Sequence, residues 1–231
     1  MIHEELLHLI YPNVCVVCRR VLLKKEKYCC SACMAEFDTF VSPVASEQMM
    51  RHTIASRFGA TFHFEKGWCR YLFHKKSSLQ VALHAMKYER LFNLGIIFGR
   101  QLGEWMLSDG NIEDIECIVP VPLHPLKKIE RSYNQSEKIA EGIGQALRKS
   151  VRSDLLVRKK YTRSQTGLTA EDRKKNMDSA FQVTQGIMLR HVLLVDDVLT
   201  TGATMASATL AFHKEKVERV SLATLALAAR E

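Results

Sequence analysis

The sequence contains no apolar run as long as the ~18 residues that a membrane-spanning helix needs. Its first residues, 1–5, do not show the pattern of a secretory signal peptide. A disordered or low-complexity chain is excluded as well, because 47% of the residues are hydrophobic and 25% are charged. We therefore expect a cytoplasmic protein without membrane insertion, and its 231 residues suffice for one or two domains with a sizeable core.

The even set of cysteines that a disulfide scaffold would need is also missing, because the chain has seven. An odd number without a secretory leader favours a reducing compartment and a metal site. Four cysteines form two knuckles, Cys15-Val-Val-Cys18 and Cys30-Ser-Ala-Cys33. Paired Cys-x-x-Cys knuckles are typical of structural zinc, since four thiolates can converge on one tetrahedral ion. We predict a four-cysteine zinc-ribbon unit over residues 1–40.

The third zinc ligand has two candidates, Cys29 and Cys30, which are adjacent in the sequence. Only Cys30 gives the two-residue spacing to Cys33, so we assign the ligands as Cys15, Cys18, Cys30 and Cys33. Four protein sulfurs leave no open position, and the zinc is therefore expected to be structural rather than catalytic. The alternative is a set of buried or redox-active thiols.

The net charge of +8 is concentrated in one stretch of the chain. Residues 124–176 hold 14 Lys and Arg against 6 Asp and Glu, which accounts for the whole excess. A confined basic patch of this kind typically meets phosphate groups. The alternative is an ordinary solvated surface, and composition does not decide between the two.

Hydrophobic periodicity predicts two helices, over about 77–89 and 92–107, within a helical connector that we place at 41–112. Residues 41–76 show little pattern of their own. Ser132-Tyr-Asn-Gln135 fits a capping box, which predicts a helix start at Ser132.

Residues 113–231 alternate between strand and helix patterns, which predicts a parallel sheet flanked by helices. The pattern predicts strands over 115–121, 155–157, 180–183, 191–195 and 217–227, and a helix over 203–214. The continuous apolar run His191-Val-Leu-Leu-Val195 is typical of a strand buried on both faces.

Two carboxylates, Asp196 and Asp197, follow this apolar strand, and a loop rich in Thr and Gly then leads directly into a helix. Ligands of open α/β sheets bind at this end of the strands. Free N–H groups at a helix start favour phosphate, and adjacent carboxylates can accept hydrogen bonds from vicinal hydroxyls. The pattern therefore predicts a site for a ribose 5-phosphate moiety. The alternative, that the two acids merely cap a turn, leaves the complete Thr/Gly loop unexplained.

Residues 192–204 resemble the phosphoribosyl pyrophosphate (PRPP) binding motif of the type I phosphoribosyltransferases. The chain as a whole resembles the ComF family of late competence proteins. Three stretches carry this second resemblance: the paired cysteine knuckles, Val119–Leu123 through Arg131–Gln135, and Ser164–Leu168 with Arg173 and Asn176. The resemblance implies a type I phosphoribosyltransferase fold over 113–231.

The resemblance also implies a role for each site residue. Asp196 and Asp197 would accept hydrogen bonds from the ribose hydroxyls and are the candidate catalytic residues, with Asp197 as a candidate general base. The 5-phosphate would be bound by the loop residues Thr200, Thr201, Gly202, Ala203 and Thr204. The loop facing pyrophosphate would run from Leu123 to Arg131, with Lys127, Lys128 and Arg131 as its cations. Residues 158–176 would form a lid, and Mg²⁺ would accompany PRPP, held chiefly by substrate and water.

Two functions follow as hypotheses. The first is a Mg-dependent phosphoribosyltransferase that transfers ribose 5-phosphate from PRPP to an unknown nitrogen acceptor. The second, implied by the ComF resemblance together with the basic stretch, is a non-catalytic module of natural transformation. Such a module would use the same fold to bind single-stranded DNA or a competence helicase or ATPase.

Overall fold

The computed structural model describes residues 13–59, 62–89, 91–110, 112–123, 131–158, 180–186 and 188–229. Its centre is a five-stranded sheet in which all neighbours run parallel, in the order β1-β7-β6-β2-β3. The strands are β1 (Gly67–Phe73), β2 (Cys117–Pro120), β3 (Ser150–Val151), β6 (His191–Leu199) and β7 (Arg219–Ala228). The predicted parallel α/β sheet is confirmed.

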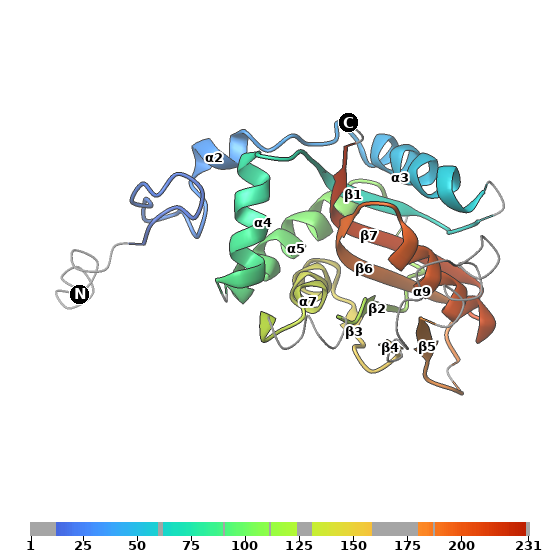
Figure 1. Ribbon diagram of the computed structural model, residues 1–231. Helices are drawn as coiled ribbons and strands as arrows, with labels where there is room; N and C mark the ends of the chain where they lie inside the picture. Colours follow the sequence, from blue (N-terminus) through green and yellow to red (C-terminus); the bar gives the residue numbers. More distant parts are fainter. Residues whose placement is uncertain are drawn as a thin grey trace, which may run out of the picture.

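Helices cover both faces of this sheet, and each face has its own apolar core (Figure 1). One core contains α4 (Ser78–Tyr88), α5 (Phe92–Leu107) and α7 (Gln135–Leu147), and the other contains α3 (Pro43–Phe58) and α9 (Ala203–Lys214). Neighbouring residues of one strand alternate between the cores: Leu193 faces the first and Leu194 the second. Burial on both faces explains why the central strands are continuous apolar runs.

The connections leave β2 and β6 in opposite directions. After β2 the chain passes through α7 to β3 at one edge of the sheet, whereas after β6 it passes through α9 to β7 on the other side. The boundary between β2 and β6 is therefore the point where the strand order reverses. In open α/β sheets, a crevice at the carboxyl ends of two such strands is where ligands bind.

The helices predicted over 92–107 and 203–214 have these bounds in the structure, as α5 and α9, and α4 differs from the predicted 77–89 by one residue at each end. Strand β6 is longer than predicted, because its pairing with β7 continues as far as Leu199 and Leu227. Asp196 and Asp197 consequently lie within the last part of the strand rather than after it.

The prediction of a capping box that starts a helix at Ser132 is wrong. Helix α7 begins at Gln135, and its N-cap is Asn134, whose side-chain oxygen accepts a hydrogen bond from the Ser136 N–H at 3.2 Å. Ser132 has a φ of +64°, which belongs to a tight turn and not to a helix start. Ser136, in the first turn of α7, donates its hydroxyl to Asp196 of β6.

The strands predicted over 155–157 and 180–183 exist but do not join the main sheet. They are β4 (Leu156–Arg158) and β5 (Phe181–Val183), which pair with each other in an antiparallel two-stranded sheet. The alternation of strand and helix patterns therefore overstated the extent of the parallel sheet. Leu156 and Phe181 of this hairpin pack into the same core as α9.

Residues 41–76, for which no element was predicted, hold α3 and β1. Strand β1 pairs in parallel with β7 and so forms one edge of the main sheet. The N-terminal region contributes the short helix α2 (Ser31–Ala35). No helix within the described ranges combines the length and the apolar content that crossing a membrane requires.

Candidate functional site

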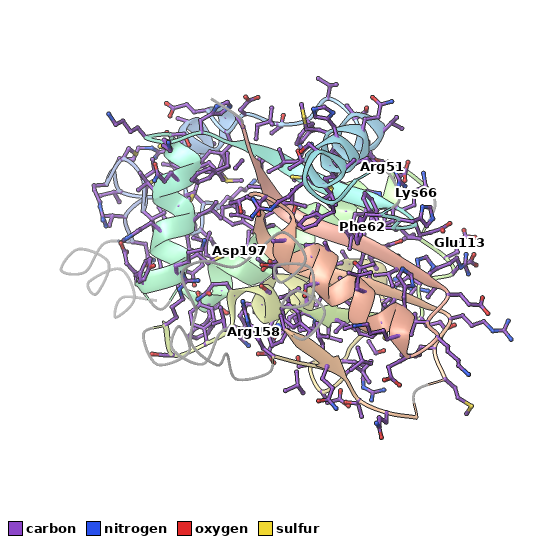
Figure 2. All side chains as sticks on the ribbon, turned by 45° about the vertical axis from the view of Figure 1, so that its right-hand side comes forward. Arg51, Phe62, Lys66, Glu113, Arg158 and Asp197 are labelled. Atoms are coloured by element: carbon purple, nitrogen blue, oxygen red, sulfur yellow. The ribbon has the colours of Figure 1, made fainter. Side chains whose placement is uncertain are left out.

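A cleft of about 250 Å³ opens at the carboxyl ends of β2 and β6, at the point where the strand order reverses. Figure 2 shows Asp197 and Arg158 at this cleft, away from Lys66 and Glu113. Its walls come from separate parts of the chain: Lys87 of α4, Val121–Leu123 after β2, Arg131 and Ser136 near α7, Arg158 of β4, and Asp196–Val198, Thr200 and Thr204 at the end of β6 and the start of α9. The predicted residues Leu123, Arg131, Asp196, Asp197, Thr200 and Thr204 thus meet in one place.

The acidic pair lies at the floor of the cleft and is held by several donors. The Ser136 hydroxyl and the backbone N–H of Asp197 each donate to Asp196 Oδ1 at 2.9 Å. The Val198 N–H donates to Asp197 Oδ1 at 2.7 Å. The Lys87 ammonium lies 2.7 Å from Asp197 Oδ2. Each carboxylate is therefore fixed in orientation before any ligand arrives.

The two carboxylates are not equivalent. Burial of its carboxyl group, and then the charge of Asp197, raise the pKa of Asp196 to about 7. The hydrogen bond from Ser136 and the charge of Lys87 act in the opposite direction. Two adjacent acids whose environments differ in this way are found at functional sites, because such sites require groups that change protonation near neutral pH.

The loop between β6 and α9 has the features of a phosphate cradle. Gly202 has a φ of +76° and is the N-cap of α9, so that the loop turns sharply into the helix. Gly202 has no side chain to cap this helix start, and the contact of the Ala203 N–H with Thr201 Oγ1 there is a long one, at 3.4 Å. The N–H groups of the first turn and the helix dipole favour an anion at this position. Thr200 and Thr201 are exposed, and Thr204 lines the cleft from the first turn of α9.

Arg131 is the buried cation of the cleft, with an exposed fraction of 9%. Its guanidinium donates to Gln135 Oε1 at 3.1 Å and to the Tyr88 hydroxyl at 3.4 Å, and it lies 5.3 Å from the centre of the Tyr88 ring. Its Nε is buried and has no hydrogen-bond partner among the described residues. Because a buried, unpaired donor is costly, this atom points to a group that the site is built to receive.

Two cations of the cleft, Lys87 and Arg158, were not predicted. Lys87 comes from the last turn of α4, more than 100 residues before its partner Asp197. Arg158 comes from β4, at the edge of the segment predicted to be a lid. Sequence spacing carries no signal for either contact. The predicted cations Lys127 and Lys128, and the predicted lid from residue 159 onward, lie outside the described residues.

The cysteine cluster lies in the N-terminal region and is separate from the cleft. The Sγ atoms of Cys15, Cys18, Cys30 and Cys33 all lie within 4.8 Å of one another, and Cys18 and Cys30 are 3.7 Å apart. Four sulfurs bound tetrahedrally to zinc at about 2.3 Å would be about 3.8 Å apart, so the cluster fits one zinc ion. The Cys33 N–H, donating to Cys30, is the main cause that lowers the pKa of Cys30 to about 6.

Cys29 does not belong to this cluster. Its side chain is 3% exposed and packs into the apolar core that contains α4 and α5, and burial raises its pKa to about 12. Cys29 is not among the four cysteines whose sulfur atoms lie within 4.8 Å of one another. Of the two candidates that the sequence left open, the structure places Cys30 with the other three cysteines.

Comparison with known proteins agrees with this geometry. Residues 131–231, which include α7, the acid pair and the Thr/Gly loop, match the family described as Phosphoribosyl transferase domain. The chain is 26% identical over 222 residues to Competence protein F of Haemophilus influenzae, which covers 93% of this chain and 96% of that protein. The resemblance to the ComF family is confirmed. The chain thus combines a phosphoribosyltransferase-type fold with a cysteine cluster compatible with a zinc ribbon.

Two further relatives have the same name. The chain is 31% identical over 131 residues to DNA utilization protein YhgH of Escherichia coli K12, a match that spans 55% of this chain and 58% of that protein. It is 26% identical over 203 residues to the protein of that name in Salmonella typhimurium, covering 86% of this chain and 89% of the relative.

Proposed function

We propose that the chain binds PRPP and transfers its ribose 5-phosphate to a nitrogen acceptor. The observation that carries this proposal is the cleft itself: an oriented pair of carboxylates and the Thr/Gly loop at the start of α9 line it together, at the point where the strand order reverses. The match of residues 131–231 to the phosphoribosyl transferase domain supports it.

In this proposal the parts of the substrate meet different walls of the cleft. The ribose hydroxyls donate to Asp196 and Asp197, and the 5-phosphate accepts hydrogen bonds from the loop Thr200–Thr204. The pyrophosphate group lies against the cations Arg131 and Arg158. Lys127 and Lys128 remain candidates for the same group.

The reaction breaks the bond between C1 of the ribose and a pyrophosphate oxygen, forms a bond from C1 to the acceptor nitrogen, and releases a proton from that nitrogen. Negative charge develops on the leaving pyrophosphate, and Arg131 and Arg158 stabilise it because they are already in place. Magnesium bound to the pyrophosphate oxygens would neutralise part of the same charge. Asp197 is our candidate to accept the proton.

Calorimetry with PRPP and Mg²⁺ tests the proposal directly. We expect saturable binding to the wild-type chain and loss of at least tenfold in affinity when Asp196→Asn and Asp197→Asn are combined, about 1.4 kcal/mol or more. Asp154→Asn is a matched control, since Asp154 pairs with Arg152 on the exposed surface. An absence of PRPP binding in the folded, zinc-loaded protein overturns the proposal.

Single-stranded DNA binding is the second candidate function. The relatives are named for competence and for DNA utilization, and a role in DNA uptake would unite these names. In the cysteine-rich region, Lys24, Lys25 and Lys27 are exposed and could contact phosphates. A competence helicase or ATPase would be the protein partner of such a module.

Fluorescence anisotropy with a labelled oligonucleotide tests this second candidate. Phosphate contacts predict an affinity that falls steeply as salt is raised. Lys24→Ala with Lys25→Ala should weaken binding and flatten the salt dependence, whereas the exposed pair Lys214→Ala with Lys216→Ala serves as control. Binding that is absent, or equal in both variants and insensitive to salt, speaks against DNA contact through these residues.

The remaining assignments belong to the same proposal. The chain acts in the cytoplasm, residues 1–40 form a zinc-stabilised unit, residues 41–112 a connecting hood, and residues 113–231 the phosphoribosyltransferase-like domain. Strand β1 and helix α4 of the hood contribute to the sheet and to the cleft, respectively. The hood would therefore act together with the domain and not as a free linker.

A further inference from the structure

Lys87 forms an ion pair with Asp197 inside the cleft that we assign to the phosphoribosyl group. Its Nζ lies 2.7 Å from Asp197 Oδ2, with the two side chains 20% and 16% exposed. The other oxygen of Asp197 already accepts the Val198 N–H. In the free protein both oxygens of Asp197 are therefore engaged.

The end of α4 that carries Lys87 is fixed in place by its neighbours. Tyr88, the next residue, lies against the buried Arg131 through its ring and its hydroxyl. The Tyr133 hydroxyl donates to the carbonyl oxygen of Met86, whose side chain is fully buried. The contacts of Met86 and Tyr88 thus fix the backbone on both sides of Lys87 and keep its ammonium near Asp197. The long side chains of exposed surface ion pairs lack such support.

An ammonium at this position changes what the acid pair can bind. Two adjacent carboxylates in a cleft are the type of ligand that attracts a divalent cation. Lys87 occupies one oxygen of Asp197 and adds a positive charge within a few ångströms, where screening by solvent is incomplete. A divalent cation that approaches the acid pair therefore finds one oxygen already occupied and is repelled by the charge of the ammonium.

We propose that Lys87 is a positioning residue of the phosphoribosyl site, which holds Asp197 in the free protein and keeps divalent cations off the acid pair until a phosphorylated substrate brings its own. This inference rests on the proposed function. The ammonium has three donors, of which the contact with Asp197 Oδ2 at 2.7 Å uses one.

Titration of the zinc-loaded protein with Mn²⁺, without PRPP, tests the proposal. We expect weak Mn²⁺ binding in the wild type and an affinity at least about tenfold higher in Lys87→Met and in Lys87→Gln, measured by electron paramagnetic resonance of free Mn²⁺. Lys87→Arg should retain the weak binding, because it restores the charge. Lys66→Met is the matched control: Lys66 lies away from Asp197 (Figure 2) and also pairs with an acid, Glu47, at 3.5 Å.

Adding Asp197→Asn to Lys87→Met should abolish the gain, which assigns the new Mn²⁺ site to Asp197. The proposal is overturned if both Lys87→Met and Lys87→Gln melt like the wild type yet bind Mn²⁺ no better. The proposal is also overturned if Lys66→Met raises the affinity for Mn²⁺ as much as Lys87→Met does, because the loss of any lysine would then produce the effect. Failure of the proposed function would show itself differently, as absent PRPP binding in the wild type, with the Mn²⁺ result unaffected.

Discussion

Gly202 of the phosphate loop lies directly against Ile54 of α3, so that a β-carbon at position 202 would come within 2.6 Å of Ile54 Cγ1. Ile54 is 1% exposed and therefore cannot move aside into solvent. The loop that turns into α9 is thus supported from behind by a helix more than 140 residues earlier in the chain. Glycine is required here for two reasons, its positive φ and this contact.

Gly202→Ala should lower the free energy of unfolding by about 2–4 kcal/mol, because an unfavourable left-handed conformation adds to overpacking against Ile54. Gly186→Ala is the control, since Gly186 has a similar φ of +75° but nothing within 4 Å of its added β-carbon. Urea denaturation of both variants separates the two causes. Equal losses would mean that the contact with Ile54 contributes nothing.

The elements that were predicted correctly are those whose own residues show a full apolar pattern or motif. The apolar run 191–195 and the motif at 196–204 specify a buried strand, a tight loop and a helix start, and all three are present. Helix α5 was predicted with the bounds that it has, because its buried residues Leu94, Phe98 and Leu102 repeat at helical spacing.

The elements that were missed lack such a signal. The buried face of α3 includes Ser46 and Thr53 beside Met50 and Ile54, so that polar residues interrupt the apolar stripe. Ser46 is buried because its hydroxyl donates to the Pro43 carbonyl and accepts from the Cys69 N–H. Contacts such as Lys87 with Asp197 depend on how distant elements pack, and no local pattern predicts them.

Zinc binding can be tested on the two adjacent cysteines. Cys30→Ser should reduce bound zinc from one ion per chain to substoichiometric levels, because it removes one of four clustered sulfurs. Cys29→Ala should keep the zinc and cost only the packing of a buried side chain. Metal content by mass spectrometry, with a thermal melt of each variant, makes the comparison. Loss of zinc from Cys29→Ala alone would contradict the assignment.

Close packing of α5 on α7 depends on small residues. A β-carbon at Gly99 would collide with the backbone of Ile139, so that Gly99→Ala must push the two helices apart. We expect a loss of about 1–3 kcal/mol in the free energy of unfolding, despite the better helix propensity of alanine. Asn93→Ala, at an exposed position of the same helix, should be neutral or slightly stabilising. A Gly99→Ala variant as stable as the wild type would mean that the helices separate without cost.

The carboxyl group of Asp196 should make the stability of the protein depend on pH. Its pKa is raised from 3.8 to about 7 in the folded state, mainly by burial, so between these values the folded chain binds more protons than the unfolded chain. The contribution of this group to the free energy of unfolding is therefore most favourable below about pH 4 and is lost as pH rises through about 7.

The Asp196→Asn variant tests this dependence, because its side chain cannot ionise. Relative to the wild type, this variant should gain stability between pH 5 and pH 8, as measured by urea denaturation at each pH. Asp154→Asn should instead differ from the wild type by a constant amount over this range, because the hydrogen bond from Arg152 lowers the pKa of Asp154 to about 2 and the group is ionised in both the folded and the unfolded chain above pH 5. A wild type and an Asp196→Asn variant whose stabilities change in parallel over this range would mean that Asp196 is already ionised at pH 5.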